Sequence, residues 1–219
     1  MNRYVVPVRG LQKGQQDMHL ILSVPEKMAG QILQRRVKQV EVGVDDGRFI
    51  SVIQRRKIYA TLRDIAEYTG YTDEAMKEVM KYEHMLKTGC EYFSLSDCSM
   101  TDAREFLNTL MEYALKEGVI LTESGLERTD DIDTYLIQCI RYRKCCICGR
   151  PADIHHEDAI GMGNDRRHYD DSHNRIMALC RNHHTIAHQR GKKAFMEIYK
   201  VYGIERYRAE ESAAGVVYT

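Results

Sequence analysis

Residues 145–156 read CCICGRPADIHH, and residues 175–188 read RIMALCRNHHTIAH. The first stretch contains the CxxC pair Cys145 and Cys148, and the second contains the CxxH pair Cys180 and His183. Two such pairs supply four ligands for a tetrahedral ion, which is the closed geometry of a structural zinc site. CxxC spacing favours Cys145 as the first ligand, with the adjacent Cys146 as the alternative. A domain of about 70 residues buries little apolar surface, so a zinc ion would supply stability that its core lacks.

The same two stretches predict a strand, a second strand and a helix, over residues 153–156, 175–179 and 180–190. On the helix, His184 and His188 are four residues apart, so their rings share one face and can chelate one ion. One histidine of the first strand would complete a three-ligand, open metal site of the catalytic type. The neighbouring strand histidine then points to the opposite face and is free to act as a base.

These histidine and cysteine stretches resemble the HNH nuclease family, which has a ββα-metal fold, and in detail the phage HNH proteins with a Cys/His zinc knuckle. The resemblance implies that His155, His184 and His188 hold the catalytic divalent ion and that His156 is the general base. It also implies a hydrolase that cuts the phosphodiester bonds of DNA and leaves a 5′-phosphate. Imidazole ligands suit Ni²⁺ or Zn²⁺, while Mg²⁺ or Mn²⁺ are the alternatives in a cell.

The family's middle asparagine orients the base, and two residues are candidates for it. Asn174 is the better match, because it stands directly before the second strand. Asn164 is the alternative, and the sequence alone leaves the choice between them open.

The net charge is zero only because two unlike parts cancel. The 219 residues include 32 Lys+Arg and 32 Asp+Glu, but residues 141–208 hold 14 basic and 8 acidic residues, whereas residues 1–140 hold 18 and 22. The predicted metal sites therefore lie in a segment of net charge +6, which suits a polyanionic partner such as DNA. Some basic residues there serve only as solvated surface charges. The candidates for phosphate contact are Arg166, Arg167, Arg181, Arg190, Lys192 and Lys193.

Residues 1–120 predict an α+β domain without visible catalytic groups. Strands are expected at residues 4–8, 19–24 and 40–44, and helices after Asp46-Gly47, after Thr72 and from Ser99 to Gly118. Residues 121–140 are expected to form a polar linker and a connecting helix, 141–208 the zinc-stapled ββα domain, and 209–219 a frayed tail. The predicted fold class is α+β throughout.

Residues 53–60 and the block formed by 94–96 with the helix 101–118 resemble the phage NinB/Orf recombination proteins. That resemblance implies a homodimer that binds single-stranded DNA, with Arg55, Arg56 and Lys57 in contact with the strand. The alternative for these three cations is a solvated helix face.

The leading hypothesis is a metal-dependent DNA endonuclease that acts in phage recombination or DNA processing. The alternatives are a non-catalytic, zinc-containing single-stranded DNA-binding recombination mediator and a zinc-stabilised protein that never contacts DNA. The local charge of +6 disfavours the last. Clustered cysteines beside histidines, and no apolar run of about 18 residues, predict a cytoplasmic protein without a membrane segment. The resemblance to phage proteins implies a phage or prophage origin.

Overall fold

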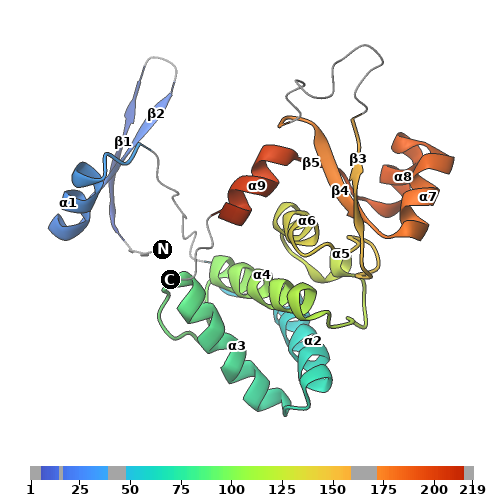
Figure 1. Cartoon of the computed structure of the whole chain (residues 1–219). Helices are drawn as coiled ribbons and strands as arrows, with labels where there is room; N and C mark the ends of the chain where they lie inside the picture. The colour runs from blue at the N-terminus through green and yellow to red at the C-terminus, as the bar shows by residue number, and fades with distance from the viewer. Residues whose placement is uncertain (1–5, 15–16, 39–47, 159–171, 215–219) are drawn as a thin grey trace.

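The computed structural model describes residues 6–14, 17–38, 48–158 and 172–214. Its helices and two small antiparallel sheets give the α+β class that the sequence predicts (Figure 1). The first sheet pairs β1 (Val8–Lys13) with β2 (Met18–Leu22). Residues 4 and 5 of the strand expected at 4–8 lie outside the described residues, and β1 begins only at Val8. The strand expected at residues 40–44 lies outside the described residues.

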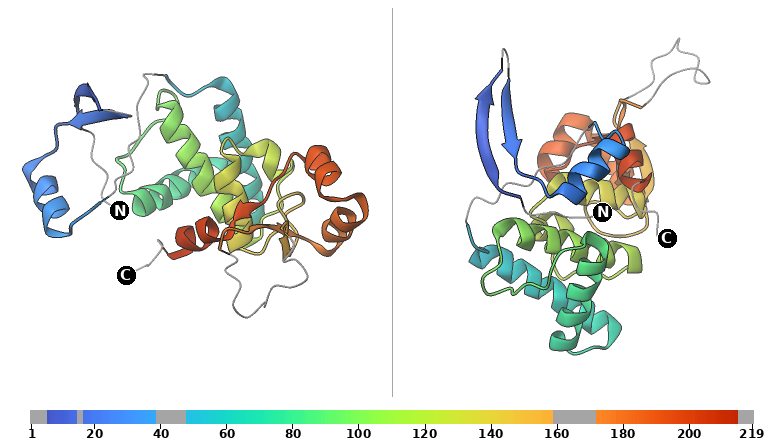
Figure 2. Two further views of the ribbon diagram at one scale, coloured as in Figure 1. Left: turned by 90° about the horizontal axis from the view of Figure 1, so that it is seen from above. Right: turned by 90° about the vertical axis from the view of Figure 1, so that its left-hand side faces the viewer.

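The β1–β2 hairpin and α1 (Glu26–Gln34) project from the rest of the molecule (Figures 1 and 2). No residue within 6–14 or 17–38 is buried. The strands β1 and β2 therefore add nothing to the hydrophobic core.

Three long helices form the body next to this projection: α2 (Val52–Thr69), α3 (Asp73–Thr88) and α4 (Met100–Glu117). Each begins where a side-chain hydroxyl accepts a hydrogen bond from a backbone N–H of the first turn, and each ends at a glycine in the left-handed region. Their apolar stripes interlock in a core that excludes water. The N-caps are Ser51, Thr72 and Ser99, and the C-caps are Gly70, Gly89 and Gly118.

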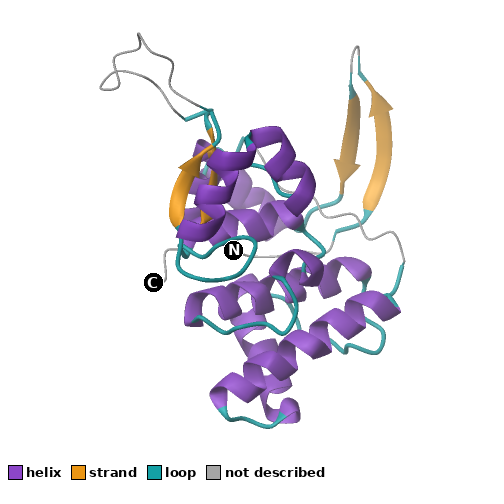
Figure 3. Cartoon of the chain, turned by 90° about the vertical axis from the view of Figure 1, so that its right-hand side faces the viewer, coloured by secondary structure: helices purple, strands orange, loops and turns teal. Residues whose placement is uncertain are grey.

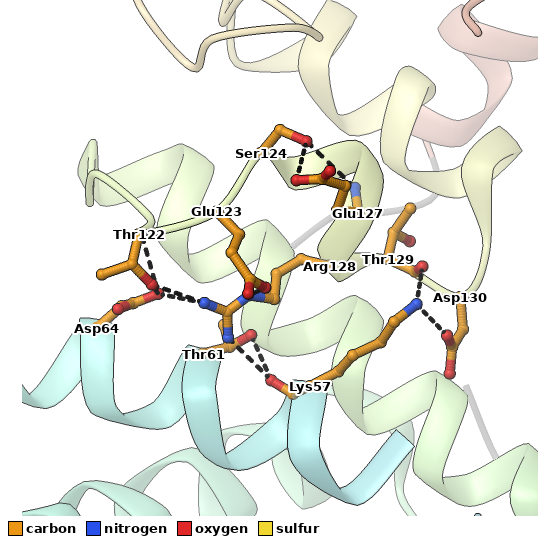
Figure 4. Close-up of polar contacts among 10 residues, drawn as sticks. All are labelled: Lys57, Thr61, Asp64, Thr122, Glu123, Ser124, Glu127, Arg128, Thr129 and Asp130. Atoms are coloured by element: carbon orange, nitrogen blue, oxygen red, sulfur yellow. Dashed lines mark hydrogen bonds and ion pairs between the residues drawn. The ribbon is translucent and has the colours of Figure 1, made fainter. Parts of the chain in front are cut away.

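The segment expected to be a polar linker is instead packed against α2. It contains the short helix α5 (Gly125–Arg128), and the side chain of Arg128 is only 1% exposed. The Arg128 guanidinium donates to Asp64 at 3.1 Å and to Thr122 at 2.8 Å, and it pairs with Glu123 at 3.0 Å (Figure 4). A buried cation with several acceptors fixes this segment to α2, so its polar composition marks a tertiary contact and not a flexible connection.

The connecting helix α6 (Ile132–Arg141) is likewise part of the core. It packs between α4 and strand β4 (Arg175–Leu179), burying Tyr135, Leu136 and Cys139. The Tyr135 hydroxyl donates to the carbonyl of Cys146 at 3.3 Å. The helical body and the segment with the predicted metal sites therefore share a continuous core.

The second sheet has the strand order β3–β4–β5, with β3 at Asp153–His156 and β5 at Ile204–Glu205. Helices α7 (Arg181–Arg190) and α8 (Lys192–Tyr199) follow β4 and lie beside the sheet (Figures 1 and 3). Helix α9 (Arg206–Ala214) contacts α6 and buries Ala209, which corrects the expectation of a frayed tail from residue 209. No helix within the described ranges is both long and apolar enough to cross a membrane.

Candidate functional site

The first metal-binding group is built by a tight turn that faces the start of α7. Residues 145–150 fold back on themselves, because Gly149 donates its N–H to the Cys145 carbonyl at 2.8 Å and Cys145 donates to the Arg150 carbonyl at 2.7 Å. Gly149 has a backbone φ of +68°, which residues other than glycine rarely adopt. Cys180 is the residue that immediately precedes α7, and His183 lies in its first turn.

The four predicted ligands of the zinc knuckle, Cys145, Cys148, Cys180 and His183, lie close together. The Sγ atoms of Cys148 and Cys180 are 3.6 Å apart, and the Nδ1 atom of His183 lies 3.4 Å from Cys145 Sγ and 3.3 Å from Cys180 Sγ. A tetrahedral zinc with ordinary Zn–S and Zn–N bonds separates its ligand atoms by roughly 3.8 Å and roughly 3.6 Å respectively. The donor set and its spacing therefore fit a structural zinc ion.

Cys145, and not Cys146, belongs to this group. Cys146 is fully buried, and its backbone N–H donates to the carbonyl of Ala178 on β4 at 3.1 Å. Burial raises the pKa of the Cys145 thiol to about 12. For Cys180, burial opposes ionisation, but hydrogen bonds led by the His183 backbone N–H outweigh it and lower the pKa. Such thiols need a cation to become thiolates together, which is what zinc supplies.

The second group joins β3 to one face of α7. The ring of His155 lies with its centroid 4.7 Å from that of His184 and 5.1 Å from that of His188, and the two helical rings are 4.7 Å apart. Their ligand nitrogens all lie within 4.8 Å of one another. The predicted trio of histidines is thus brought together, and three imidazoles suit a divalent transition metal.

Burial favours the neutral form of the His155 and His184 imidazoles, which is the form that binds a metal. Burial, followed by the proximity of His184 and His188, lowers the pKa of His155 to about 4. Burial also lowers the pKa of His184, with His188 as the next cause. His188 is exposed, and it borders an open hollow of about 440 Å³ with Arg181 and Gln189. A substrate can therefore approach the trio from the α7 side.

The predicted base and asparagine lie at one end of the β3–β4 pair. His156 is the last residue of β3, is exposed, and pairs with Ile176. Asn174 directly precedes β4 and accepts a hydrogen bond from the Arg206 N–H through its backbone carbonyl at 3.0 Å. Asn164 lies outside the described residues. Asn174 is therefore placed two residues from the partner of His156.

Two acidic residues that the sequence analysis did not single out, Glu157 and Asp158, directly follow His156, the predicted base. The side chain of Glu157 is 1% exposed and accepts from the Gly203 N–H at 2.7 Å, and Lys192 pairs with it at 2.8 Å. Asp158 accepts from the Arg175 N–H at 3.0 Å. This hydrogen bond is the main cause that lowers the pKa of Asp158 to about 2. The sequence could have drawn attention to Glu157 and Asp158 only through their position next to His155 and His156. The residues that they contact are far away in the sequence.

Two of the basic residues predicted to contact DNA form ion pairs within the described fold. Lys192 is paired with Glu157 and Asp158, and Lys57 donates to Asp130 at 2.6 Å and to the Thr129 carbonyl at 2.7 Å (Figure 4). Both cations thus hold parts of the fold together. Arg166 and Arg167 lie outside the described residues. Of the remaining described candidates, Arg56, Arg181, Arg190 and Lys193 are exposed, and Arg55 is partly buried.

A family model described as "Putative HNHc nuclease" matches residues 24–210. No curated protein and no solved structure matches the chain. The resemblance of residues 53–60 and 94–118 to the NinB/Orf proteins is not confirmed. The family match covers most of the chain, including the helical body, α6 and both metal-binding groups. The chain therefore belongs to the HNH nuclease family.

Proposed function

We propose that this protein is a metal-dependent DNA endonuclease whose catalytic ion is held by His155, His184 and His188. The observation that supports the proposal is the convergence of one strand histidine and two helical histidines within 4.8 Å, next to an exposed histidine that is not part of the trio. When bound, a divalent cation would polarise the phosphate and stabilise the charge on the leaving oxygen.

The reacting proton would be handled by His156. Its neutral imidazole would accept a proton from water as the water oxygen forms a bond to phosphorus. The bond from phosphorus to the 3′ oxygen then breaks, leaving a 5′-phosphate. The exposure of His156 supports this role, because solvent and substrate reach it freely. Asn174, at the same end of the strand pair, would orient the imidazole.

We further propose that Cys145, Cys148, Cys180 and His183 hold a structural zinc. This ion would fix the start of α7 to the turn before β3. His183 and His184 are adjacent, so the knuckle places the helix that carries two of the three catalytic ligands. The recombination setting and the homodimer remain predictions.

The test is incubation of the zinc-loaded full chain with linear duplex, single-stranded and branched DNA, each with Mg²⁺, Mn²⁺, Ni²⁺ or added Zn²⁺. We expect cleavage products with 5′-phosphates, detected by end-labelling, in the presence of at least one metal and not with chelator. Intact DNA in every combination would contradict the endonuclease and favour the non-catalytic, single-stranded DNA-binding alternative.

A further inference from the structure

A second hollow, of about 240 Å³, lies on the helical body, formed by two helices and a loop. Helix α2 contributes Arg55, helix α3 contributes Lys77 and Lys81, and the loop before α4 contributes Ser94 and Ser96. Within the described residues, its lining holds three cations and no carboxylate. A concave surface of this composition favours an anion.

The cations of this hollow are not fully compensated within the described fold. The Lys81 side chain is 5% exposed, and its ammonium lies 3.8 Å from Glu78, the same carboxylate that lies 3.7 Å from the ammonium of Lys77. One partly exposed carboxylate thus serves two ammonium groups. Burying an ammonium without a full counter-charge is costly, so an anion in the hollow would stabilise the pair.

Arg55 also lines the hollow, and one of its N–H donors is unused within the described residues. One terminal nitrogen donates to the Ser96 carbonyl at 2.7 Å, but the buried Nε–H has no acceptor among the described residues. The hydroxyls of Ser94 and Ser96 lie 2.8 Å apart at the rim. Hydroxyl, ammonium and guanidinium donors together match the oxygens of a phosphate.

Aromatic rings flank the cations. Tyr59 lies one turn after Arg55 on α2 and is 44% exposed, and Tyr92 is 57% exposed. The ammonium of Lys81 lies 4.4 Å from the centre of the Tyr92 ring and donates to its hydroxyl at 3.1 Å. Exposed rings beside a cationic groove are the features with which proteins hold unpaired bases and their backbone.

We propose that this hollow binds a backbone phosphate of single-stranded DNA, with Tyr59 and Tyr92 against the adjacent bases. The inference deepens the proposed function and rests on it, since DNA is then the polymer that both sites contact. The chain holds the strand on its helical body, away from the histidine trio, and the hollow selects single strands because only unpaired bases present their faces to the two rings.

The experiment uses the full, zinc-loaded chain with His156→Ala as parent, so that DNA stays intact. Fluorescence anisotropy with a labelled oligothymidine of about 20 nucleotides measures affinity from about 0.05 to 0.2 M salt. The test variant adds Arg55→Gln and Lys77→Gln. The control adds Arg63→Gln and Lys116→Gln, which remove the same charge from exposed positions of α2 and α4 outside the hollow.

Loss of the one phosphate contact in the hollow lowers the salt slope on a single strand by about 0.7, so the test variant binds roughly 5-fold more weakly at 0.1 M salt. The control binds like the parent. Lys77→Gln alone, which removes no contact with the loop, gives about half of the slope change. Tyr59→Ala weakens binding of the single strand more than binding of its duplex.

Equal affinity and slope in parent, test variant and control would overturn the proposal, as would a parent that does not bind the oligonucleotide. The two proposals fail separately. If the chain with His156 intact cuts no DNA but the test variant loses binding, only the nuclease proposal fails. If that chain cuts DNA and the hollow variants bind normally, only the hollow proposal fails.

Discussion

The Sγ atom of Cys148 lies 3.6 Å from the Sγ atom of Cys180, although 32 residues separate them. The contact joins the turn before β3 to the residue that precedes α7. Strands β3 and β4, which pair with each other, both lie between these two cysteines in the chain. The knuckle therefore helps to position the histidine trio, because His155 lies in β3 and His184 and His188 lie in α7.

Replacement of one knuckle ligand should unfold this part of the chain. In small zinc domains the ion contributes on the order of 10 kcal/mol at neutral pH, so Cys148→Ser should release zinc and lower the thermal midpoint markedly. The control is Cys90→Ser, because Cys90 lies outside the metal-binding group. Zinc content and circular dichroism melting check the result. A Cys148→Ser chain that keeps its zinc and melts like the Cys90→Ser control would refute the structural site.

The reactivity of the cysteines should report on the ion without mutation. Only thiolates are alkylated readily, so Cys98, whose pKa burial raises to about 11, should stay unmodified by iodoacetamide at about pH 8. The partly exposed Cys90 should react first. Addition of a chelator should then make Cys148 and Cys180 reactive. Peptide mass spectrometry identifies each site, and early labelling of Cys148 in the zinc-loaded chain would contradict coordination.

The buried pair of Arg128 and Asp64 should dominate the stability of the helical body. Asp64→Asn leaves a guanidinium that is 1% exposed with one charged partner fewer, which should cost about 3 kcal/mol in the free energy of unfolding. The control, Glu210→Gln, breaks the exposed pair with Arg206 and should cost less than about 0.5 kcal/mol. Urea unfolding measures both. Equal effects would show that Arg128 does not depend on Asp64.

The histidine trio should bind an ion of its own, separate from the zinc ion of the knuckle. His188→Ala removes an exposed ligand, so Ni²⁺ affinity should fall by about 100-fold or more while the zinc content stays unchanged. His19→Ala, in the projecting hairpin, is the control and should bind Ni²⁺ like the unmodified chain. Isothermal titration calorimetry measures the Ni²⁺ affinity of each chain. An undiminished affinity in the His188→Ala chain would show that His188 is not a ligand.

Much of this architecture follows from local patterns in the sequence. Capping residues and apolar periodicity predicted α2, α3 and α4, because helix ends and faces are determined by residues a few positions apart. The same holds for the HxxxH pair of α7 and the CxxC and CxxH pairs of the knuckle. CxxC spacing already favoured Cys145 over Cys146, and the structure places Cys145 among the four converging ligands.

Contacts between distant residues account for what the sequence did not predict. The polar composition of residues 121–129 suggested a linker. The sequence did not reveal the burial of Arg128, because it depends on Asp64, 64 residues earlier in α2. Lys57 and Lys192 looked like free phosphate contacts for the same reason. Their acidic partners become visible only when the chain is folded.

In the proposed reaction, His156 takes the proton from the attacking water. The most direct measurement is the rate of DNA cleavage by the His156→Ala chain beside the unmodified chain, with equal zinc content and equal melting temperature. Loss of a general base predicts a rate lower by about 10²–10⁴-fold in every metal that supports cleavage. A rate equal to that of the unmodified chain would contradict the assignment.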